Sequence, residues 1–127
     1  MGHPKWDEVN AMEPGLKFDQ LIAEQVMKWK PHSRNTGLWV DANDINHPMA
    51  SSHGSIFDFH PTKNIVDAWK VVERMRRDGN EVNLWMYEPY RGVRCMIEDA
   101  NHGPQFSFKG KTAPEAICKS ALLAVMP

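Results

Sequence analysis

The sequence predicts an α+β fold in which a three-stranded antiparallel sheet is sandwiched between helices, in the order α-loop-α-β-β-β-α. Two stretches, 16–29 and 62–78, place apolar residues at helical spacing, and residues 81–108 alternate like strands separated by turns. A helix-capping motif near residue 112 adds a last helix. With 127 residues, 42% of them hydrophobic, the chain is expected to form a single domain, 1–127, around one core.

The first helix is expected to run from Leu16 to Trp29. Pro14-Gly15 breaks the chain before it, and Pro31 stops it soon after Trp29. The apolar residues of this stretch share one side of a helix and should face the core. They are Phe18, Leu21, Ile22, Val26 and Trp29.

Residues 31–61 have no regular period, although they contain short apolar patches. A stretch of this length without a period is unusual inside a compact domain. We expect a long irregular loop with one or two short extended pieces. Ordered long loops often carry function, so this loop is a place to look for a site.

The second helix is expected from Thr62 or Lys63 to Asp78, and Gly79 follows it at the position that favours glycine. Arginines crowd its last turn, where positive charge suits the helix dipole. Its apolar positions predict a core face that includes a tryptophan. These positions are Ile65, Ala68, Trp69, Val72 and Met75.

Three strands follow, at 81–87, at 92–98 and around Phe106 and Phe108. The first strand has bulky apolar side chains on both faces, so we expect helices to cover both faces of the sheet. The last helix opens with a capping box, in which the Thr112 side chain accepts the Glu115 amide and the Glu115 carboxylate accepts the Thr112 amide.

The charge balance argues against a nucleic-acid partner, because the chain has 15 Lys and Arg residues and 16 Asp and Glu residues, which gives a net charge of −1. The order of elements in 62–126 is that of a double-stranded-RNA-binding domain, but the last helix opens Thr-Ala-Pro-Glu and lacks the lysines that bind phosphates there. No apolar run is long enough to cross a membrane, and the N-terminus does not resemble a signal peptide. With only two cysteines, the protein is expected to be cytoplasmic.

Neither a metal site nor a catalytic motif is predicted. His47, His53 and His60 lie too far apart in sequence for the tight ligand pairs of zinc sites, and Cys95 and Cys118 do not form a close pair. A nucleophile elbow and a phosphate-binding loop are both missing from the sequence. We therefore expect no cofactor and no enzymatic activity, with a small hydrolase using the loop histidines as a weaker alternative.

Aromatic and arginine side chains cluster around the first predicted hairpin. An arginine beside aromatic rings can hold a planar, anionic ligand such as a nucleotide, through stacking and paired hydrogen bonds to phosphate. The same side chains could instead make contacts between subunits or extend the core. Trp6 and Trp39 lie outside the regular elements, where an exposed tryptophan favours an interface or a ligand pocket. The candidate ligand-binding residues are Trp39, Trp85, Tyr87, Tyr90, Arg91 and Arg94.

Three blocks of sequence resemble a known family. They are 21–29 (LIAEQVMKW), 64–73 (NIVDAWKVVE) and 112–123 (TAPEAICKSALL). In order and content they are similar to blocks of the phage ABA-sandwich domain family, small proteins of phages and prophages. Lys28 stands where the family usually has glycine, so the end of the first helix is expected to differ. Lys119-Ser120 stands where Arg-Ala is more usual.

The resemblance implies a phage-encoded protein with helices on both faces of a sheet, and it carries over no catalytic residue. The function we favour is non-enzymatic binding in the cytoplasm of the infected bacterial cell. In its sharpest form, a homo-oligomer sequesters a host signalling nucleotide, cyclic or of ADP-ribose type, to counter anti-phage defence. The alternative is a protein-interaction module that binds and inhibits a host protein.

Overall fold

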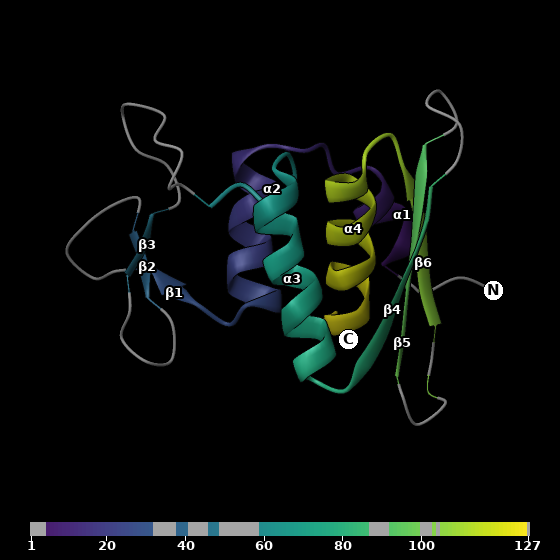
Figure 1. Cartoon of the computed structure of the whole chain (residues 1–127). Coiled ribbons are helices and arrows are strands. Elements are labelled where there is room, and N and C mark those ends of the chain that lie inside the picture. The colour runs from purple at the N-terminus through teal and green to yellow at the C-terminus, as the bar shows by residue number, and fades with distance from the viewer. Residues whose placement is uncertain are drawn as a thin grey trace.

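A layer of helices lies between a sheet of long strands and a second sheet of very short strands (Figure 1). The computed structural model describes residues 5–31, 38–40, 46–48, 59–86, 92–99, 103 and 105–126. The elements in chain order are the helices α1 (Trp6–Asn10) and α2 (Leu16–Leu21), the π-helical turn η1 (Ile22–Val26), the strands β1 (Lys30–Pro31), β2 (Leu38–Val40) and β3 (Asn46–Pro48), the helix α3 (Ile65–Arg77), the strands β4 (Asn80–Met86), β5 (Val93–Asp99) and β6 (Gln105–Gly110), and the helix α4 (Ala113–Val125).

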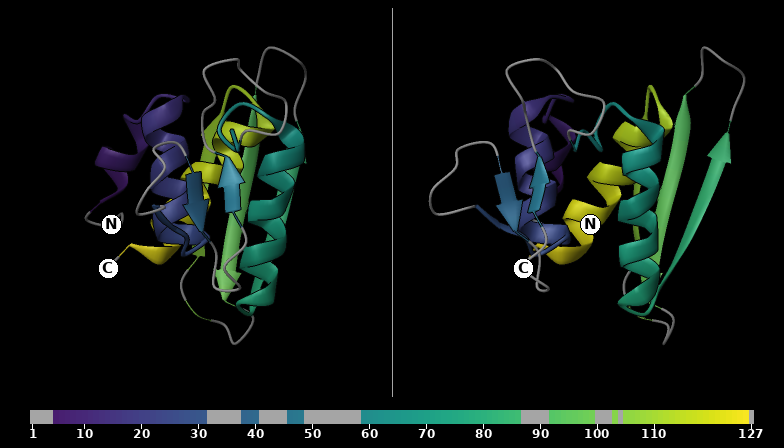
Figure 2. Two further views of the ribbon diagram at one scale, coloured as in Figure 1. Left: turned by 90° about the vertical axis from the view of Figure 1, so that its left-hand side faces the viewer. Right: turned by 60° about the vertical axis from the view of Figure 1, so that its left-hand side comes forward.

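The predicted class, the chain order and the three-stranded antiparallel sheet are confirmed. The long sheet has the order β4-β5-β6, and the short sheet has the order β1-β2-β3. Helices α2, α3 and α4 lie between them, and two further views show the same arrangement (Figure 2). Helix α4 packs directly on β5 and β6, and α3 packs beside it.

The inner face of the long sheet, which points toward α4, forms one side of the core. Leu84, Cys95 and Phe108 lie in one row across the three strands, and Cys95 and Phe108 are fully buried. The neighbouring row contains Ile97, which is also buried. The alternation that predicted the strands therefore assigns the inward side chains correctly.

The outer face of the long sheet, which points away from α4, differs from the prediction. Among the described residues no helix covers this face (Figure 1), so the expectation of helices on both faces is wrong there. The expectation relied on bulky side chains of the outward phase, but Trp85 is 44% exposed and its neighbours in β4 are Asn83 and Glu81, both exposed. One exposed tryptophan and the half-buried Met96 of β5, among polar residues, do not require a second apolar layer.

Helix α3 is capped at its start by Asn64, whose side-chain oxygen accepts hydrogen bonds from the amides of Val66 and Asp67 at 2.8 and 3.3 Å. This side chain satisfies two of the donors that a helix leaves open at its start. The helix ends at Arg77, and Gly79 follows with a φ of 93°. The boundaries thus lie close to those expected from the sequence.

The side of α3 that faces the core is rotated from the predicted one. Trp69 and Ile65 are 48% and 51% exposed, so placing Trp69 in the core is wrong. The apolar residues that α3 buries against its neighbours are Ala68, Val71, Val72 and Met75. The start of α3 has two apolar sides. One contains Ile65, Val66 and Trp69, and the other contains the smaller residues Ala68, Val71 and Val72. Helix α4 packs against the side with the smaller residues.

The predicted first helix divides into α2 and the π-helical turn η1. The Met27 amide donates to the Ile22 carbonyl at 3.0 Å, and the Trp29 amide donates to the Ala23 carbonyl at 2.9 Å. These wider turns bring Trp29 into the core, as predicted. Between them, Lys28 has a φ of 61°, in the left-handed region that disfavours side chains with a Cβ. The lysine thus takes the backbone conformation that suits the family's usual glycine.

The last helix is capped as predicted on one side only. The Thr112 hydroxyl oxygen accepts from the Glu115 amide at 3.3 Å. The Glu115 carboxylate accepts from the amide of Lys111 at 2.8 Å, instead of from that of Thr112. The carboxylate thereby orders the turn that leads from β6 into α4.

Helix α1 was not expected from the sequence, and it accounts for Trp6. The Trp6 ring stacks on the ring of Phe108 with centroids 5.0 Å apart. The buried Lys119 of α4 donates from its Nζ to the backbone carbonyl of Asn10 at 2.8 Å. These contacts fasten the first helix to the sheet and to α4.

The segment between residues 30 and 58 contains the short sheet, in place of the expected one or two extended pieces. Trp39 of β2 pairs with Pro31 and with His47, while residues 32–37, 41–45 and 49–58 lie outside the described residues. At its two ends, the rings of Trp29 and Phe59 contact each other with centroids 4.7 Å apart, and both are buried. The segment therefore leaves the core and returns to it at one place.

Replacing Lys28 with glycine should stabilise the protein. Glycine adopts the left-handed region without steric cost, so Lys28→Gly should raise the free energy of unfolding by about 1 kcal/mol. Chemical denaturation measures the change. Lys17→Gly in α2 is the matched control and should lower stability by about 0.5–1 kcal/mol, since glycine weakens a helix. A loss of stability in Lys28→Gly would contradict the strain argument.

Candidate functional site

A row of three side chains crosses the outer face of the long sheet next to the β4–β5 hairpin. In the strand register Trp85 lies opposite Arg94, and Arg94 lies opposite Lys109. The Arg94 guanidinium donates to the Ser107 hydroxyl at 2.9 Å, which holds it over the sheet. We call these three residues the Trp85 row. It combines an exposed aromatic surface with two positive charges.

Charge changes along the outer face. Beyond the Trp85 row lies an uncharged row, and beyond that a row with two carboxylates. The uncharged row contains Asn83, Met96 and Ser107, and the acidic row contains Glu81, Glu98 and Gln105. An anion would therefore be attracted to the hairpin end of this face and repelled from the other end.

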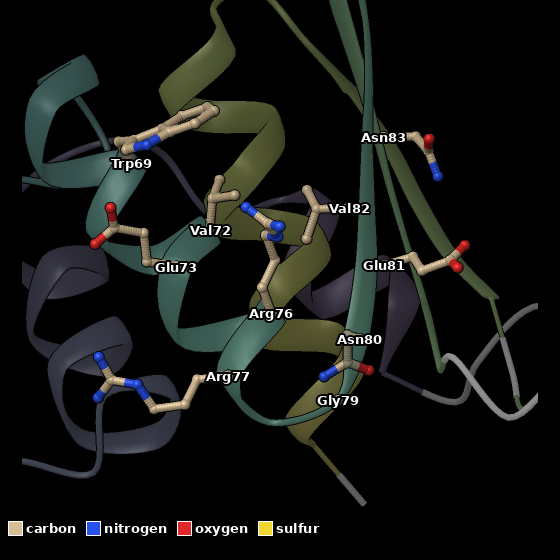
Figure 3. Close-up of a pocket in the computed structure, with 10 residues that line it drawn as sticks. All are labelled: Trp69, Val72, Glu73, Arg76, Arg77, Gly79, Asn80, Glu81, Val82 and Asn83. Carbon is tan, nitrogen blue, oxygen red and sulfur yellow. The ribbon is translucent and has the colours of Figure 1, made fainter.

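A groove of about 800 Å³ separates α3 from the free edge of β4 (Figure 3). Trp69, Val72 and Arg76 of α3 line one wall, and Val82 of β4 lies opposite. The Arg76 side chain extends along the groove, while Asn83 points from β4 away from it (Figure 3). We call this the α3–β4 groove.

Sequence reasoning missed the groove, because it placed Trp69 in the core and explained the arginines of α3 by the helix dipole alone. One signal was present. Ile65, Val66 and Trp69 give the start of α3 more apolar residues than a single buried stripe needs, and all three are exposed.

Comparison with known proteins identifies the family. Residues 20–122 match the family described as the Phage ABA sandwich domain. This chain belongs to the Phage ABA sandwich domain family. The fold is similar to that in the 2.0 Å crystal structure of a phage protein from Bacillus cereus ATCC 14579, with a TM-score of 0.61, 24% sequence identity, and coverage of 91% of this chain and 95% of that one. No curated protein matches the sequence.

The structure brings together only some of the residues predicted for the site in this phage ABA-sandwich domain. Trp85 and Arg94 are neighbours in the Trp85 row. Trp39 lies on β2, on the far side of the helices from the long sheet (Figure 1), and so is separate from them. Tyr87, Tyr90 and Arg91 lie outside the described residues.

A buried carboxylate organises the return of the chain into α3. Asp19 is 1% exposed and accepts from the amide and hydroxyl of Thr62, at 2.9 and 2.7 Å. His60 Nδ1 lies 3.2 Å from the same carboxylate, and Thr62 accepts from the Gly15 amide at 3.0 Å. The cluster thus ties residues 60–62 to the start of α2.

The hydrolase alternative gains nothing from this cluster. An aspartate can orient a histidine for catalysis, but the Thr62 hydroxyl donates to Asp19 and Cys118 donates to a backbone carbonyl, so neither serves His60 as a nucleophile. His47 and His53 have no described side chain. Within the described ranges, no group of three or more His, Cys, Asp or Glu could hold a metal ion.

Both cysteines of the domain are buried in the core, as predicted. Burial raises the pKa of Cys95 to about 12, an effect that the Ser120 hydroxyl partly offsets. Burial, together with the negative charge of Asp19, raises the pKa of Cys118 well above its ordinary 9.0. Both thiols are therefore protonated and unreactive near neutral pH.

The described helices contain no stretch that is long and apolar enough to cross a membrane.

Removing the buried carboxylate should destabilise the fold. Asp19→Ala leaves the amide and hydroxyl of Thr62 without their acceptor and should lower the free energy of unfolding by about 3 kcal/mol, since each unsatisfied buried group costs about 1–3 kcal/mol. Asp7→Ala, which removes an exposed carboxylate of α1, is the control and should change stability by less than about 0.5 kcal/mol. Equal effects in denaturant titrations would refute a structural role for the cluster.

The thiols give a second prediction. At pH 8, iodoacetamide should modify neither cysteine in the native protein and both after unfolding. The folded protein keeps these thiols protonated above pH 9, where unfolded thiols ionise, so stability should fall as the pH rises from 9 toward 12. Rapid labelling of either native thiol, followed by mass spectrometry, would contradict this.

Proposed function

We propose that this phage ABA-sandwich domain is a non-enzymatic binding protein that sequesters a signalling nucleotide of the host, cyclic or of ADP-ribose type, in the cytoplasm of the infected cell. The proposal rests on one observation, the alignment of Trp85, Arg94 and Lys109 in a single row on the uncovered face of the sheet. Capture of such a nucleotide would remove a defence signal without any need for catalysis.

The chemistry of the Trp85 row suits a planar, anionic ligand. A nucleobase can stack on the exposed indole of Trp85, and the guanidinium of Arg94 can donate paired hydrogen bonds to phosphate. Lys109 adds a positive charge on the far side of Arg94. Strands hold all three at fixed spacing, so little ordering of the protein is needed when the ligand binds.

The surroundings of the row favour holding a ligand over cleaving it. In the strand register, the described row next to it on the outer face consists of Asn83, Met96 and Ser107, none of which is an acid or base near neutral pH; residues 87–91, on its other side, lie outside the described part of the chain. The carboxylates of this face lie one row further away, at Glu81 and Glu98. General acid–base catalysis needs such a group within hydrogen-bond reach of the reacting atoms.

A second candidate function, binding and inhibition of a host protein, also has an observation in its favour. Ile65, Val66 and Trp69 of α3 are large apolar side chains exposed on one helix beside the α3–β4 groove. Exposed apolar patches of this kind often mark protein interfaces. The two functions would use different surfaces of the domain.

Calorimetric titration with ADP-ribose, cyclic ADP-ribose and cyclic dinucleotides tests the proposal. We expect one of these classes to bind. Arg94→Ala should weaken binding by about tenfold or more, because a hydrogen bond to a charged group contributes about 1.5–3 kcal/mol, and Trp85→Ala should have a similar effect, because stacking of a base on an aromatic ring contributes about 1–3 kcal/mol. Arg77→Ala, which removes an exposed arginine of α3, is the matched control and should bind normally.

Analysis of the bound ligand separates a sponge from a hydrolase. After the complex is heated, chromatography should recover the nucleotide unchanged. Failure of every nucleotide class to bind, or equal loss of binding in Arg77→Ala and Arg94→Ala, would refute the proposal. Capture of one host protein by a domain that binds no nucleotide would favour the second function.

A further inference from the structure

Strand β4 leaves one edge of the long sheet open. It pairs with β5 over its whole length, from Asn80 opposite Asp99 to Met86 opposite Val93, and the sheet order places no other described strand beside it. Open edges of this length are commonly blocked by lysine, proline or a bulge. The seven residues of β4 contain none of these, and Glu81 is the only charged residue among them. The edge is therefore available for another strand.

Exposed apolar side chains gather around the same edge. Seven large hydrophobic side chains are exposed in the described part of the chain, and five of them belong to α3 or β4. Because α3 runs antiparallel to β4 (Figure 1), the apolar start of α3 lies toward the same end of the molecule as the end of β4. The five are Ile65, Val66, Trp69, Trp85 and Met86, with Met86 the most exposed at 77%.

The sequence of β4 is complementary to itself. If two copies pair antiparallel about Asn83, the middle residue of the strand, Val82 meets Leu84 of the second copy on the inner face. Asn83 then lies opposite Asn83 of the second copy, where the two amides can hydrogen-bond to each other. A two-fold interface needs a patch that complements itself in this way.

The charges of α3 also favour an antiparallel pair of copies. Arg76 and Arg77 lie at the end of α3 next to Gly79, and a two-fold axis through Asn83 sends the two arginine clusters to opposite ends of the seam. Trp69 lies at the level of Asn83 in Figure 3, so the two Trp69 rings would lie near the axis. The net charge of −1 adds little repulsion between copies.

We infer that two copies of this chain associate through the free edge of β4, pairing antiparallel about Asn83, with the exposed apolar side chains of α3 packed over the seam. The two three-stranded sheets then form one continuous sheet of six strands. The inference depends on the edge of β4 and on α3, and it does not depend on ligand binding at the Trp85 row. A host protein that offered an extended strand would use the same edge, and the test separates that case.

Sedimentation equilibrium tests the association. The wild-type chain should have twice its monomer mass of 14.5 kDa, and Met86→Lys and Trp69→Glu should return it to 14.5 kDa. Both side chains are exposed, so the variants should fold, which circular dichroism checks. Leu16→Lys, at an exposed leucine far from the edge in sequence, is the matched control and should remain dimeric.

Cysteine cross-linking tests the register. In Asn83→Cys the new cysteines of the two copies would lie directly opposite each other, with Cα atoms about 4.5–5.5 Å apart, and a disulfide should form on mild oxidation. In Glu81→Cys they would be separated by about 13 Å along the strands, and no disulfide should form. A monomeric wild type at about 100 µM, or equal cross-linking of both variants, would overturn the inference, whatever host protein the chain also binds.

Discussion

Helix α4 is enclosed by the rest of the protein, and the other elements are arranged around it. Every residue from Ala116 to Leu123 is buried. The sheet packs on one side of this helix, and α3, η1 and α1 pack on the others. Such a helix must satisfy its polar side chains internally. The Ser120 hydroxyl donates to the Cys95 carbonyl at 2.8 Å, and Lys119 reaches Asn10, so each polar side chain joins α4 to another element.

The small residues of α4 explain why the helices fit against one face of the sheet. Ala116, Cys118, Ser120 and Ala121 leave room for close approach, and larger side chains from the neighbours fill the remaining space. One such side chain is Phe108 of β6, whose ring also stacks on the ring of Trp6. Because the helices cover the inner face of the long sheet in this way, the core needs no second layer of helices on the outer face.

Sequence patterns correctly predicted those features of the fold that are determined by residues close together in the chain. The cap at Thr112, the strand alternation through Cys95 and Ile97, and the end of α3 before Gly79 all depend on residues close together in the chain. The side of α3 that faces the core depends on how α4 packs against it, and sequence periodicity could not choose between two apolar stripes. The π-helical turn η1, which brings Trp29 into the core, was likewise not predicted from the sequence.

The candidate site was predictable to the same extent. Trp85 and Arg94 belong to adjacent strands of one hairpin, so their alternation placed them on one face. Lys109 joins them only through the register of β6, and the α3–β4 groove requires α3 to lie beside the open edge of the sheet. Trp39 was included because it lies outside the predicted helices and strands, but the structure places it in the short sheet, away from the hairpin.

The contact between Trp29 and Phe59 has a consequence for how this family can vary. Because the two buried rings contact each other, the chain leaves the core at Trp29 and enters it again at Phe59 in the same place. Lengthening or shortening the connection would cost little loop-closure entropy, since that cost grows only slowly with length. Related phage domains could therefore differ greatly in size at this point while keeping the same helices and sheet, and the junction would tolerate a foreign insert such as a fluorescent tag.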